Sequence, residues 1–341
     1  MSYRIAINGL GRIGRCVLRA LYESTDYSGL RVVAVNDLAD RATLAHLLRY
    51  DSTHGRFLGE VRLQEDGLEV NGDLLRVFDF PDHGSLPWRD LEIDLVMECT
   101  GTFTDRQTAE QHLAAGARRV LFSQPAERDV DATLVYGVNH QQLDGTETII
   151  SNASCTTNAI IPVIRAIDQA LEIRNGLITT IHSAMNDQPV IDAYHHSNLR
   201  KTRSAMQSII PVETEIARGI GRVLPALENR FEAHAVRVPT VNVSAIDLAI
   251  LVEKSCTASQ VNDLIREESR RLPLNVLGYT QEPLASCDFN HDPRSAIVDL
   301  SFTRVSGDSL VKVLIWFDNE WAYANRMLDV AQYLAGISHA S

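Results

Sequence analysis

One cysteine lies where a reactive thiol would be useful. Cys155 belongs to the segment SNASCTTN (151–158), between the end of an expected strand and the start of an expected helix. A helix N-terminus lowers the pKa of a thiol, and a nearby histidine lowers it further, which favours the thiolate that attacks carbonyl groups. Cys155 is therefore the candidate nucleophile, although such a cysteine taken alone is more often an inert packed thiol.

A histidine can serve this thiol as a base. His182 follows a buried, strand-like run in the segment ITTIHSAMNDQ (178–188). A strand end can hold the imidazole against Cys155, and the alternative is a core histidine bonded to the backbone. The neighbouring segment 187–203 lacks a clear period and contains His195 and His196, so we expect a long functional loop there.

A glycine pattern near the N-terminus is typical of a dinucleotide site. Residues 8–15 read NGLGRIGR, which puts Gly9, Gly11 and Gly14 in G-x-G-x-x-G spacing between a strand and a helix. The first glycine permits a tight turn, the second lets a pyrophosphate approach the backbone, and the third lets helix and strand pack closely. The bare pattern also fits a purely structural turn.

Polar residues at expected strand ends strengthen this interpretation. Asp37 follows the second strand, where an acid can accept hydrogen bonds from the adenosine ribose and repel a 2′-phosphate, so NAD is expected rather than NADP. The alternative for Asp37 is the N-cap of the next helix. Thr100 and Ser123 end later strands, at the edge where open α/β sheets bind ligands.

The elements that must position these residues alternate in the first part of the chain. We expect strands at 3–8, 30–36, 94–99, 118–123, 133–138 and 148–151, and helices at 12–24, 39–49 and 105–115. Such alternation predicts an N-terminal, Rossmann-type, doubly wound α/β sheet.

The pattern changes after Cys155. A helix at 156–171 precedes long strand-like runs at 176–184, 231–254 and 309–317, and a last helix covers about 320–336. Long strands without intervening helices predict an α+β catalytic domain with a mainly antiparallel sheet. We therefore expect an NAD-binding domain at 1–154, completed by the C-terminal segment 320–341, and a catalytic domain at 155–319.

Composition excludes several classes of protein. Across 341 residues the net charge is −12, which disfavours nucleic acid as a partner. The N-terminus lacks the pattern of a signal peptide, and no long apolar run predicts a membrane span, so a cytoplasmic protein is expected. Five cysteines without C-x-x-C pairs argue against disulfides and against a metal site.

Four segments together resemble the glyceraldehyde-3-phosphate dehydrogenase superfamily. They are NGLGRIGR, SNASCTTN, RVPTVNVS (237–244) and WFDNEWAYANR (316–326), and they span nearly the whole chain. The resemblance implies an NAD-dependent oxidoreductase of an aldehyde phosphate that acts through a thioester, and a homotetramer. A regulatory or RNA-binding protein that kept this fold without turnover is a competing hypothesis.

The resemblance also implies roles for individual residues. It makes Cys155 the nucleophile and His182 its base, with Ser154 and Thr156 flanking the oxyanion and anion site. The implied anion-binding residues are Arg200, Thr214 and Arg237. The implied cofactor contacts, beyond the glycines and Asp37, are Arg12, Ile13 and Asn319, with Asn319 near the nicotinamide amide.

Within the superfamily, HSAMNDQPVIDAYH (182–195) and SIIPVET (208–214) are similar to the erythrose-4-phosphate dehydrogenases, which make 4-phosphoerythronate on the route to pyridoxal phosphate. The alternative is a phosphorylating enzyme of glycolysis. Met185 replaces a threonine that usually helps to hold the substrate phosphate, and Glu215 replaces a glycine. A Glu215 carboxylate pointing into the site would disfavour inorganic phosphate, so water is the expected second nucleophile.

Overall fold

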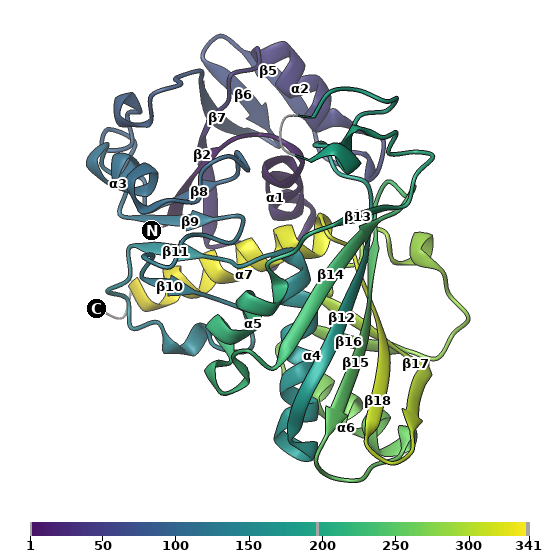
Figure 1. The fold of residues 1–341 in the computed structure, drawn as a ribbon. Coiled ribbons are helices and arrows are strands. Elements are labelled where there is room, and N and C mark those ends of the chain that lie inside the picture. Colours follow the sequence, from purple (N-terminus) through teal and green to yellow (C-terminus); the bar gives the residue numbers. More distant parts are fainter. Residues whose placement is uncertain (1, 196–197, 339–341) are drawn as a thin grey trace. The chain divides into compact units, whose positions relative to one another are not determined.

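The computed structural model describes residues 2–195 and 198–338, and Figure 1 shows its elements. His196 and the last three residues of the expected C-terminal segment lie outside the described residues. The chain forms two compact units, one made of the residues up to Ser154 together with those from Tyr323 onward, and one spanning Cys155–Ala322. Each unit contains its own sheet.

The first unit is built on a sheet of nine strands among the described residues. Their order across the sheet is β10 (Ala132–Thr133), β11 (Ile149–Ser151), β9 (Arg119–Phe122), β8 (Leu95–Glu98), β1 (Tyr3–Asn8), β2 (Leu30–Asn36), β7 (Asp73–Phe78), β6 (Gly67–Val70) and β5 (Val61–Gln64). Pairing is parallel from β10 to β7 and antiparallel from β7 to β5. The expected doubly wound sheet with parallel strands is therefore confirmed.

Short strands and helices complete this unit. They are β3 (Tyr50–Asp51) and β4 (Gly55–Arg56), α1 (Arg12–Glu23), α2 (Arg41–Arg49), α3 (Arg106–Ala114) and most of α7 (Trp321–Ser338), with short 3₁₀ turns at His83–Ser85 and His140–Gln142. The central strands are apolar on both faces, and all four residues of β8 are buried. Such strands are typical of a parallel sheet covered on both sides.

The second unit contains a sheet of seven strands within the described part of the chain. Its order is β13 (Ile210–Val212), β14 (Phe231–Arg237), β12 (Ile173–His182), β15 (Ser244–Val252), β18 (Leu310–Phe317), β17 (Ala296–Ser306) and β16 (Leu277–Thr280). Pairing is antiparallel except between β12 and β14 and between β16 and β17. The expectation of a mainly antiparallel sheet is confirmed.

The helices of the second unit are α4 (Cys155–Leu171), α5 (Ile216–Val223) and α6 (Ala258–Arg271). Both α4 and α6 contact strands of the sheet and contact each other. The buried face of α4 includes Ile160, Ile164 and Ile167, each with no exposed surface. Short 3₁₀ turns lie at Leu199–Thr202, Pro225–Leu227 and Ser286–Phe289.

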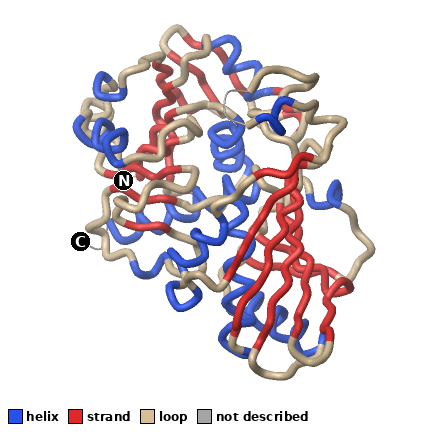
Figure 2. Tube along the Cα trace, in the orientation of Figure 1, coloured by secondary structure: helices blue, strands red, loops and turns tan. Residues whose placement is uncertain are grey.

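Three expectations from sequence were wrong in detail. The apolar run at 133–138 forms strand only at Ala132–Thr133, because a turn with Gly137 at φ +84° follows. The run at 231–254 is two strands separated by a turn in which Val243 adopts φ +66°. A helix, α6, does separate strands of the second sheet. The described residues of the segment 187–203 are largely loop, as expected, apart from the short 3₁₀ turn at Leu199–Thr202 (Figure 2).

Two further features bear on function. No helix among the described residues combines the length and the apolar character needed to cross a membrane.

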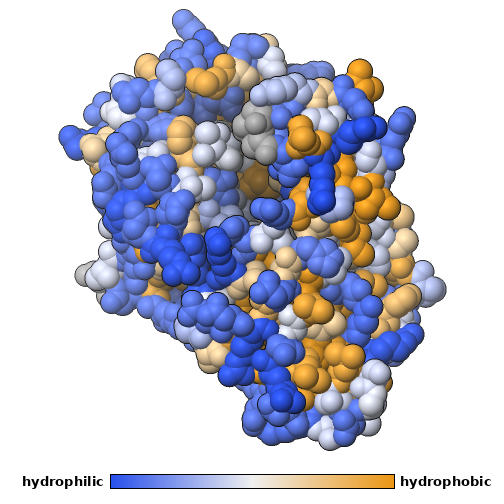
Figure 3. Space-filling view, in the orientation of Figure 1, coloured by the Kyte–Doolittle hydropathy of each residue, from blue (hydrophilic) through white to orange (hydrophobic). Residues whose placement is uncertain are grey.

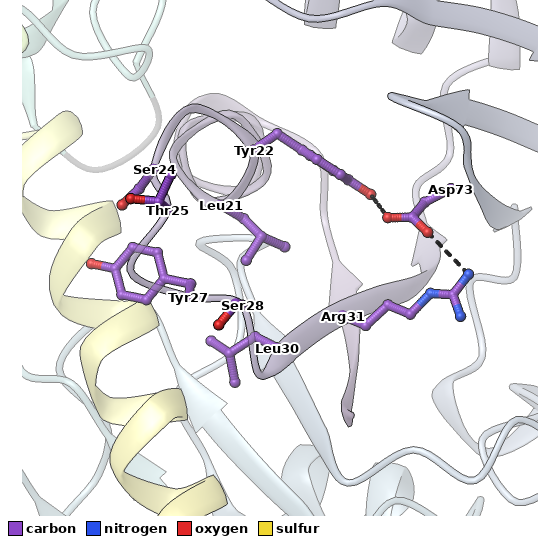
Figure 4. A pocket seen from close by; sticks show the side chains of 9 residues that line it. All are labelled: Leu21, Tyr22, Ser24, Thr25, Tyr27, Ser28, Leu30, Arg31 and Asp73. Atoms are coloured by element: carbon purple, nitrogen blue, oxygen red, sulfur yellow. Dashed lines mark hydrogen bonds and ion pairs between the residues drawn. The ribbon is translucent and has the colours of Figure 1, made fainter. Parts of the chain in front are cut away.

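A shallow depression of 360 Å³ lies beside α1 and β2 (Figure 4). Asp73 at its edge already accepts a hydrogen bond from the Tyr22 hydroxyl at 3.2 Å and pairs with Arg31 at 3.0 Å, so these polar groups are committed to one another.

Candidate active site

Cys155 is the first residue of α4. It follows β11 and the three residues 152–154, in which Ala153 adopts φ +54°. Of the five cysteines, all free, only Cys155 and Cys287 are not buried. Cys155 therefore combines partial exposure with the positive end of a 17-residue helix, and Ser154 and Thr156 flank it directly.

His182 ends β12 and faces this thiol. Its Nε2 lies 3.9 Å from Cys155 Sγ, and the Thr156 hydroxyl lies at the same distance from that sulfur. The other ring nitrogen, Nδ1, lies 2.9 Å from the carbonyl oxygen of Ser183. If Nδ1 donates to this carbonyl, Nε2 is left with a lone pair that can accept the thiol proton. The pair expected from sequence is thus brought together within one unit.

The charges of this pair differ from the expectation. Burial raises the pKa of the Cys155 thiol, although Thr156 and Arg237 act in the opposite direction. Burial, followed by the nearby Arg237 charge, lowers the pKa of His182 to about 4. Both groups are therefore neutral at pH 7, and the expected stable thiolate is replaced by a thiol beside a neutral base.

Arg237 is the last residue of β14, which pairs with β12 so that Arg237 lies opposite His182. Its Nη1 is 3.2 Å from His182 Nδ1. Because a guanidinium can only donate, this contact competes with donation from Nδ1 to the Ser183 carbonyl, and the base role of Nε2 requires the hydrogen bond to Ser183. Among the described residues, the buried Arg237 Nε has no hydrogen-bond partner. No carboxylate among the described residues forms an ion pair with this guanidinium. A half-buried, unpaired arginine beside the nucleophile and base suits an anionic part of a substrate.

Asn319 is held next to this site. Its Oδ1 accepts hydrogen bonds from the Ser183 hydroxyl at 3.0 Å and from the Ser244 hydroxyl at 2.9 Å. With both hydroxyls donating to this oxygen, the NH₂ group of Asn319 is left without partners among the described residues. The preceding Asp318, fully buried, accepts from the backbone N–H groups of Glu320 and Trp321 and so fixes the start of α7.

The glycine turn has the geometry that each glycine requires. Gly9 adopts φ +91°, and a Cβ there would lie 2.7 Å from the nitrogen of Thr100. A Cβ at Gly14 would lie 2.1 Å from the carbonyl oxygen of Gly9. A Cβ at Gly11 meets nothing within 4 Å, and Gly11 is the N-cap of α1 without a side-chain cap. Close backbone contacts therefore require glycine at Gly9 and Gly14. At Gly11 nothing in the protein occupies the space beside the uncapped N-terminus of α1, and this space suits a pyrophosphate.

The polar residues near the glycine turn lie at the ends of adjacent parallel strands. One Asp37 oxygen accepts from the backbone N–H of Leu10 at 2.7 Å and the other from that of Ala39 at 2.9 Å. The alternative that Asp37 caps the next helix is wrong, because Asp40 caps α2. Thr100 and Ser123 follow β8 and β9 respectively.

Two candidate cofactor residues lie in the first turn of α1. The guanidinium of Arg12 forms an ion pair with Asp51. Burial alone would raise the pKa of Asp51, but the Arg12 guanidinium and backbone N–H groups hold it well below its usual range. Ile13 is half-buried.

The other candidate substrate residues make no direct contact with Cys155 or His182 among the hydrogen bonds and ion pairs of the described residues, and they have partners or surroundings of their own. Arg200 is exposed on the 3₁₀ turn, and its guanidinium bonds to no described residue. The Thr214 hydroxyl accepts from the backbone N–H of Ile216 at 3.4 Å. Glu215 is largely exposed and pairs with Arg218 at 2.7 Å. The argument that its carboxylate repels phosphate from the site therefore loses its geometric basis.

Sequence reasoning missed several residues that position the site. Ser183 and Ser244 fix Asn319, and a buried group around Glu98 lies beneath the glycine turn. Ser183 directly follows His182, so its position near the site could be predicted from the sequence, whereas its hydrogen bond to Asn319 could not. Nothing in the sequence indicates that residues 244 and 319 meet, because strand pairing brings them together.

Comparison with known protein families agrees with this arrangement. Residues 3–106 match the model described as glyceraldehyde 3-phosphate dehydrogenase, NAD binding domain, and residues 154–319 match the model described as glyceraldehyde 3-phosphate dehydrogenase, C-terminal domain. The two matches together cover most of the chain. The cofactor is NAD and the reaction class is the oxidation of an aldehyde phosphate. This chain belongs to the glyceraldehyde 3-phosphate dehydrogenase superfamily.

Proposed function

We propose that this enzyme oxidises D-erythrose 4-phosphate to 4-phospho-D-erythronate through a thioester on Cys155 that water releases. The observation that carries the covalent scheme is the Cys155–His182 pair at the start of α4, with Sγ and Nε2 3.9 Å apart. The choice of substrate rests on the similarity of residues 182–195 and 208–214 to the erythrose-4-phosphate dehydrogenases. That resemblance also supports a role in pyridoxal 5′-phosphate biosynthesis.

The first half of the reaction uses the neutral base. His182 Nε2 takes the proton of the Cys155 thiol while the sulfur forms a bond to the aldehyde carbon, whose oxygen becomes an oxyanion. The unpaired backbone N–H groups that begin α4 beside Cys155 would stabilise this charge. Arg237 would hold the phosphate of the substrate, and Arg200 and Thr214 are further candidates for this role.

When bound, NAD supplies the two-electron acceptor that the oxidation requires. The residues proposed to hold it are Gly9, Gly11 and Gly14, Arg12 and Ile13, Asp37, Thr100 and Ser123, and Asn319. The open space at Gly11 and the free NH₂ group of Asn319 fit a pyrophosphate and a nicotinamide amide respectively. The carbon–hydrogen bond of the thiohemiacetal oxyanion breaks, the hydrogen leaves with both bonding electrons as a hydride, and a thioester remains on Cys155.

The second half releases the acid. After His182 has released the thiol proton to solvent, its neutral imidazole accepts a proton from water while the water oxygen bonds to the thioester carbon. The carbon–sulfur bond then breaks, and His182 returns this proton to the leaving sulfur, which regenerates the Cys155 thiol. Met185 supports water as the acceptor, since its side chain is 45% exposed and offers no hydroxyl to a phosphate ion. The exposed ion pair of Glu215 with Arg218 leaves Met185 as the main structural support for this choice.

A direct assay tests both choices. NADH production should be measured from erythrose 4-phosphate and from glyceraldehyde 3-phosphate, each with and without inorganic phosphate. We expect the higher kcat/KM with erythrose 4-phosphate and no requirement for phosphate. Higher kcat/KM with glyceraldehyde 3-phosphate, together with a strict phosphate requirement, would instead establish the phosphorylating glycolytic enzyme.

We also propose a homotetramer located in the cytoplasm. Large apolar side chains are exposed in the second unit, among them Leu177 (64%), Phe302 (56%) and Ile209 (70%), and Figure 3 shows hydrophobic residues gathered over its strands. Exposed apolar patches of this kind mark protein interfaces. Light scattering during size-exclusion chromatography should give four times the 37.9 kDa chain mass, and a monomer would contradict the proposal. The five free thiols support a reducing compartment.

A further inference from the structure

A buried carboxylate lies beneath the glycine turn of the first unit. Glu98 ends β8 and has no exposed surface. No lysine or arginine among the described residues pairs with it, so hydrogen bonds alone compensate its charge. Burial alone would raise the pKa of Glu98, but hydrogen bonds from His112, Thr100 and Asn8 hold it below its usual value. An isolated buried charge of this kind is costly unless it is fully bonded.

Each oxygen of Glu98 holds a different part of the crevice. Oε1 accepts from the backbone N–H of Thr100 at 2.9 Å and from its hydroxyl. Oε2 accepts from the Asn8 amide at 2.5 Å and lies 3.4 Å from His112 Nε2. Asn8 immediately precedes Gly9, and the Gly9 backbone packs against Cys99 and Thr100. One carboxylate therefore ties the end of β1 to the end of β8.

The donors around Glu98 cannot reverse their direction. Asn36 donates its amide to the Asn8 Oδ1 at 2.7 Å, so Asn8 must present its NH₂ group to Glu98. The amide of Asn36 is fixed in turn, because its Oδ1 accepts from the N–H of Phe80 at 2.9 Å and its Nδ2 donates to the carbonyl of Phe80 at 3.0 Å. The backbone of Phe80 therefore fixes the orientation of the Asn36 amide and, through it, that of the Asn8 amide.

The histidine on the other side is fixed as well. The indole N–H of Trp88 lies 3.0 Å from His112 Nδ1, and an indole can only donate. His112 therefore carries its proton on Nε2 and directs it toward Glu98. His83, Glu98 and His112 offer ligand atoms within 4.8 Å of one another, as a metal site would. With its Nδ1 occupied by Trp88, however, His112 could bind a metal through Nε2 only by giving up this proton.

We propose that Glu98 is a positioning residue for NAD, which shapes the turn at Gly9 and Thr100 and does not itself touch the cofactor. The proposal rests on the dinucleotide crevice described above but is independent of which aldehyde is oxidised. Glu98→Gln turns one acceptor oxygen into an NH₂ group that faces the donors of Asn8 and His112. Neither donor can turn away, so the two strand ends should separate.

The test uses NAD binding in the absence of substrate. We expect Glu98→Gln to raise the dissociation constant of NAD roughly tenfold, which is the size of effect that supporting residues have at bound groups. At saturating NAD, kcat and the KM for the aldehyde should change little. The double variant Asn8→Asp/Glu98→Gln exchanges donor and acceptor between residues 8 and 98, so it should recover part of the affinity, whereas the His112 donor still faces the new NH₂ group. Glu110→Gln on the exposed face of α3 is the matched control, with unchanged binding.

Trp88 gives a second readout that does not depend on activity. The chain has three tryptophans, so 5-fluorotryptophan labelling should give three resonances, and Trp88→Phe identifies the one that contacts His112. In the wild type NAD should shift this resonance, and in Glu98→Gln the shift should be smaller. Unchanged NAD affinity and an unchanged shift in a folded Glu98→Gln protein would overturn the proposal, as would binding of added Zn²⁺ at this cluster.

Discussion

At the residue scale, chemistry depends on two neutral groups rather than an ion pair. Because Cys155 and His182 are both uncharged at pH 7, the thiol loses its proton only as it reacts. Arg237 contributes to this state, since its positive charge opposes protonation of the adjacent imidazole. An anion bound to Arg237 would offset this positive charge and so raise the pKa of His182.

Removing the sulfur separates binding from chemistry. We expect Cys155→Ala to abolish NADH formation, with a loss of at least about 10³-fold, while NAD affinity stays within roughly twofold because the glycine turn is untouched. Single-turnover absorbance and equilibrium titration measure the two quantities. Cys287→Ala, at the exposed cysteine, is the control and should keep full activity. Residual turnover in Cys155→Ala near the wild-type rate would exclude the thioester.

The lowered pKa of His182 predicts a stability that depends on pH. Below pH 6.5 the unfolded chain binds a proton at this histidine, whereas the folded protein does not until about pH 4. The native state should therefore lose about 3 kcal/mol from this group as the pH falls through that window. When urea unfolding is followed from pH 7 to pH 4, the free energy of unfolding should fall less in His182→Asn than in the wild type. If the free energy of unfolding fell equally with pH in both proteins, the lowered pKa of His182 would be wrong.

At the element scale, the two glycines flanking Arg12 and Ile13 separate packing from ligand binding. Gly14→Ala would put a methyl group 2.1 Å from the Gly9 carbonyl oxygen, and we expect a loss of about 3 kcal/mol or more in unfolding free energy. Gly11→Ala meets open space, so its stability should change by about 0.5 kcal/mol or less while NAD binding weakens. Denaturant unfolding and NAD titration distinguish the two. Unimpaired binding by Gly11→Ala would argue against a pyrophosphate there.

Elements with a strong local signal were predictable from sequence. The first β-turn-α unit, the start of α4 at Cys155 and the end of β12 at His182 all agree with their expected positions within a few residues. The run at 133–138 misled because Leu134 and Val135 are buried without pairing in a sheet, and periodicity reports burial rather than pairing. Helix α6 was missed although Thr257 and Gln260 form a capping box that its sequence displays.

The positioning contacts were beyond sequence reasoning for a physical reason. Glu98 meets Asn8 and His112 only because parallel strands and a helix bring residues 14 to 90 positions apart together. Similarly, whether Glu215 faces a substrate depends on the rotamer that its pairing with Arg218 selects. Patterns identify which residue types are available, but side-chain direction is set by tertiary packing.

At the scale of the whole molecule, the first unit is discontinuous in sequence. Helix α7 returns to it, and the Tyr323 hydroxyl donates to the carbonyl of Ala153 at 2.8 Å. Leu334 has no exposed surface, whereas Gln332 on the same helix is exposed. Leu334→Ala should lower the free energy of unfolding by about 2–5 kcal/mol and Gln332→Ala by less than about 0.5 kcal/mol. Equal effects in calorimetry would show that α7 is not integral to the unit.

The return of α7 has a consequence for synthesis of the chain. A ribosome releases the strands of the first unit long before it has made the helix that completes them. The second unit, which is continuous from Cys155 to Ala322, is therefore the first that can finish folding during translation. Until α7 emerges, the nascent first unit exposes the surface that α7 will cover, including the Ala153 carbonyl that accepts from Tyr323. Chaperones and proteases therefore have most access to the first unit during this stage of synthesis.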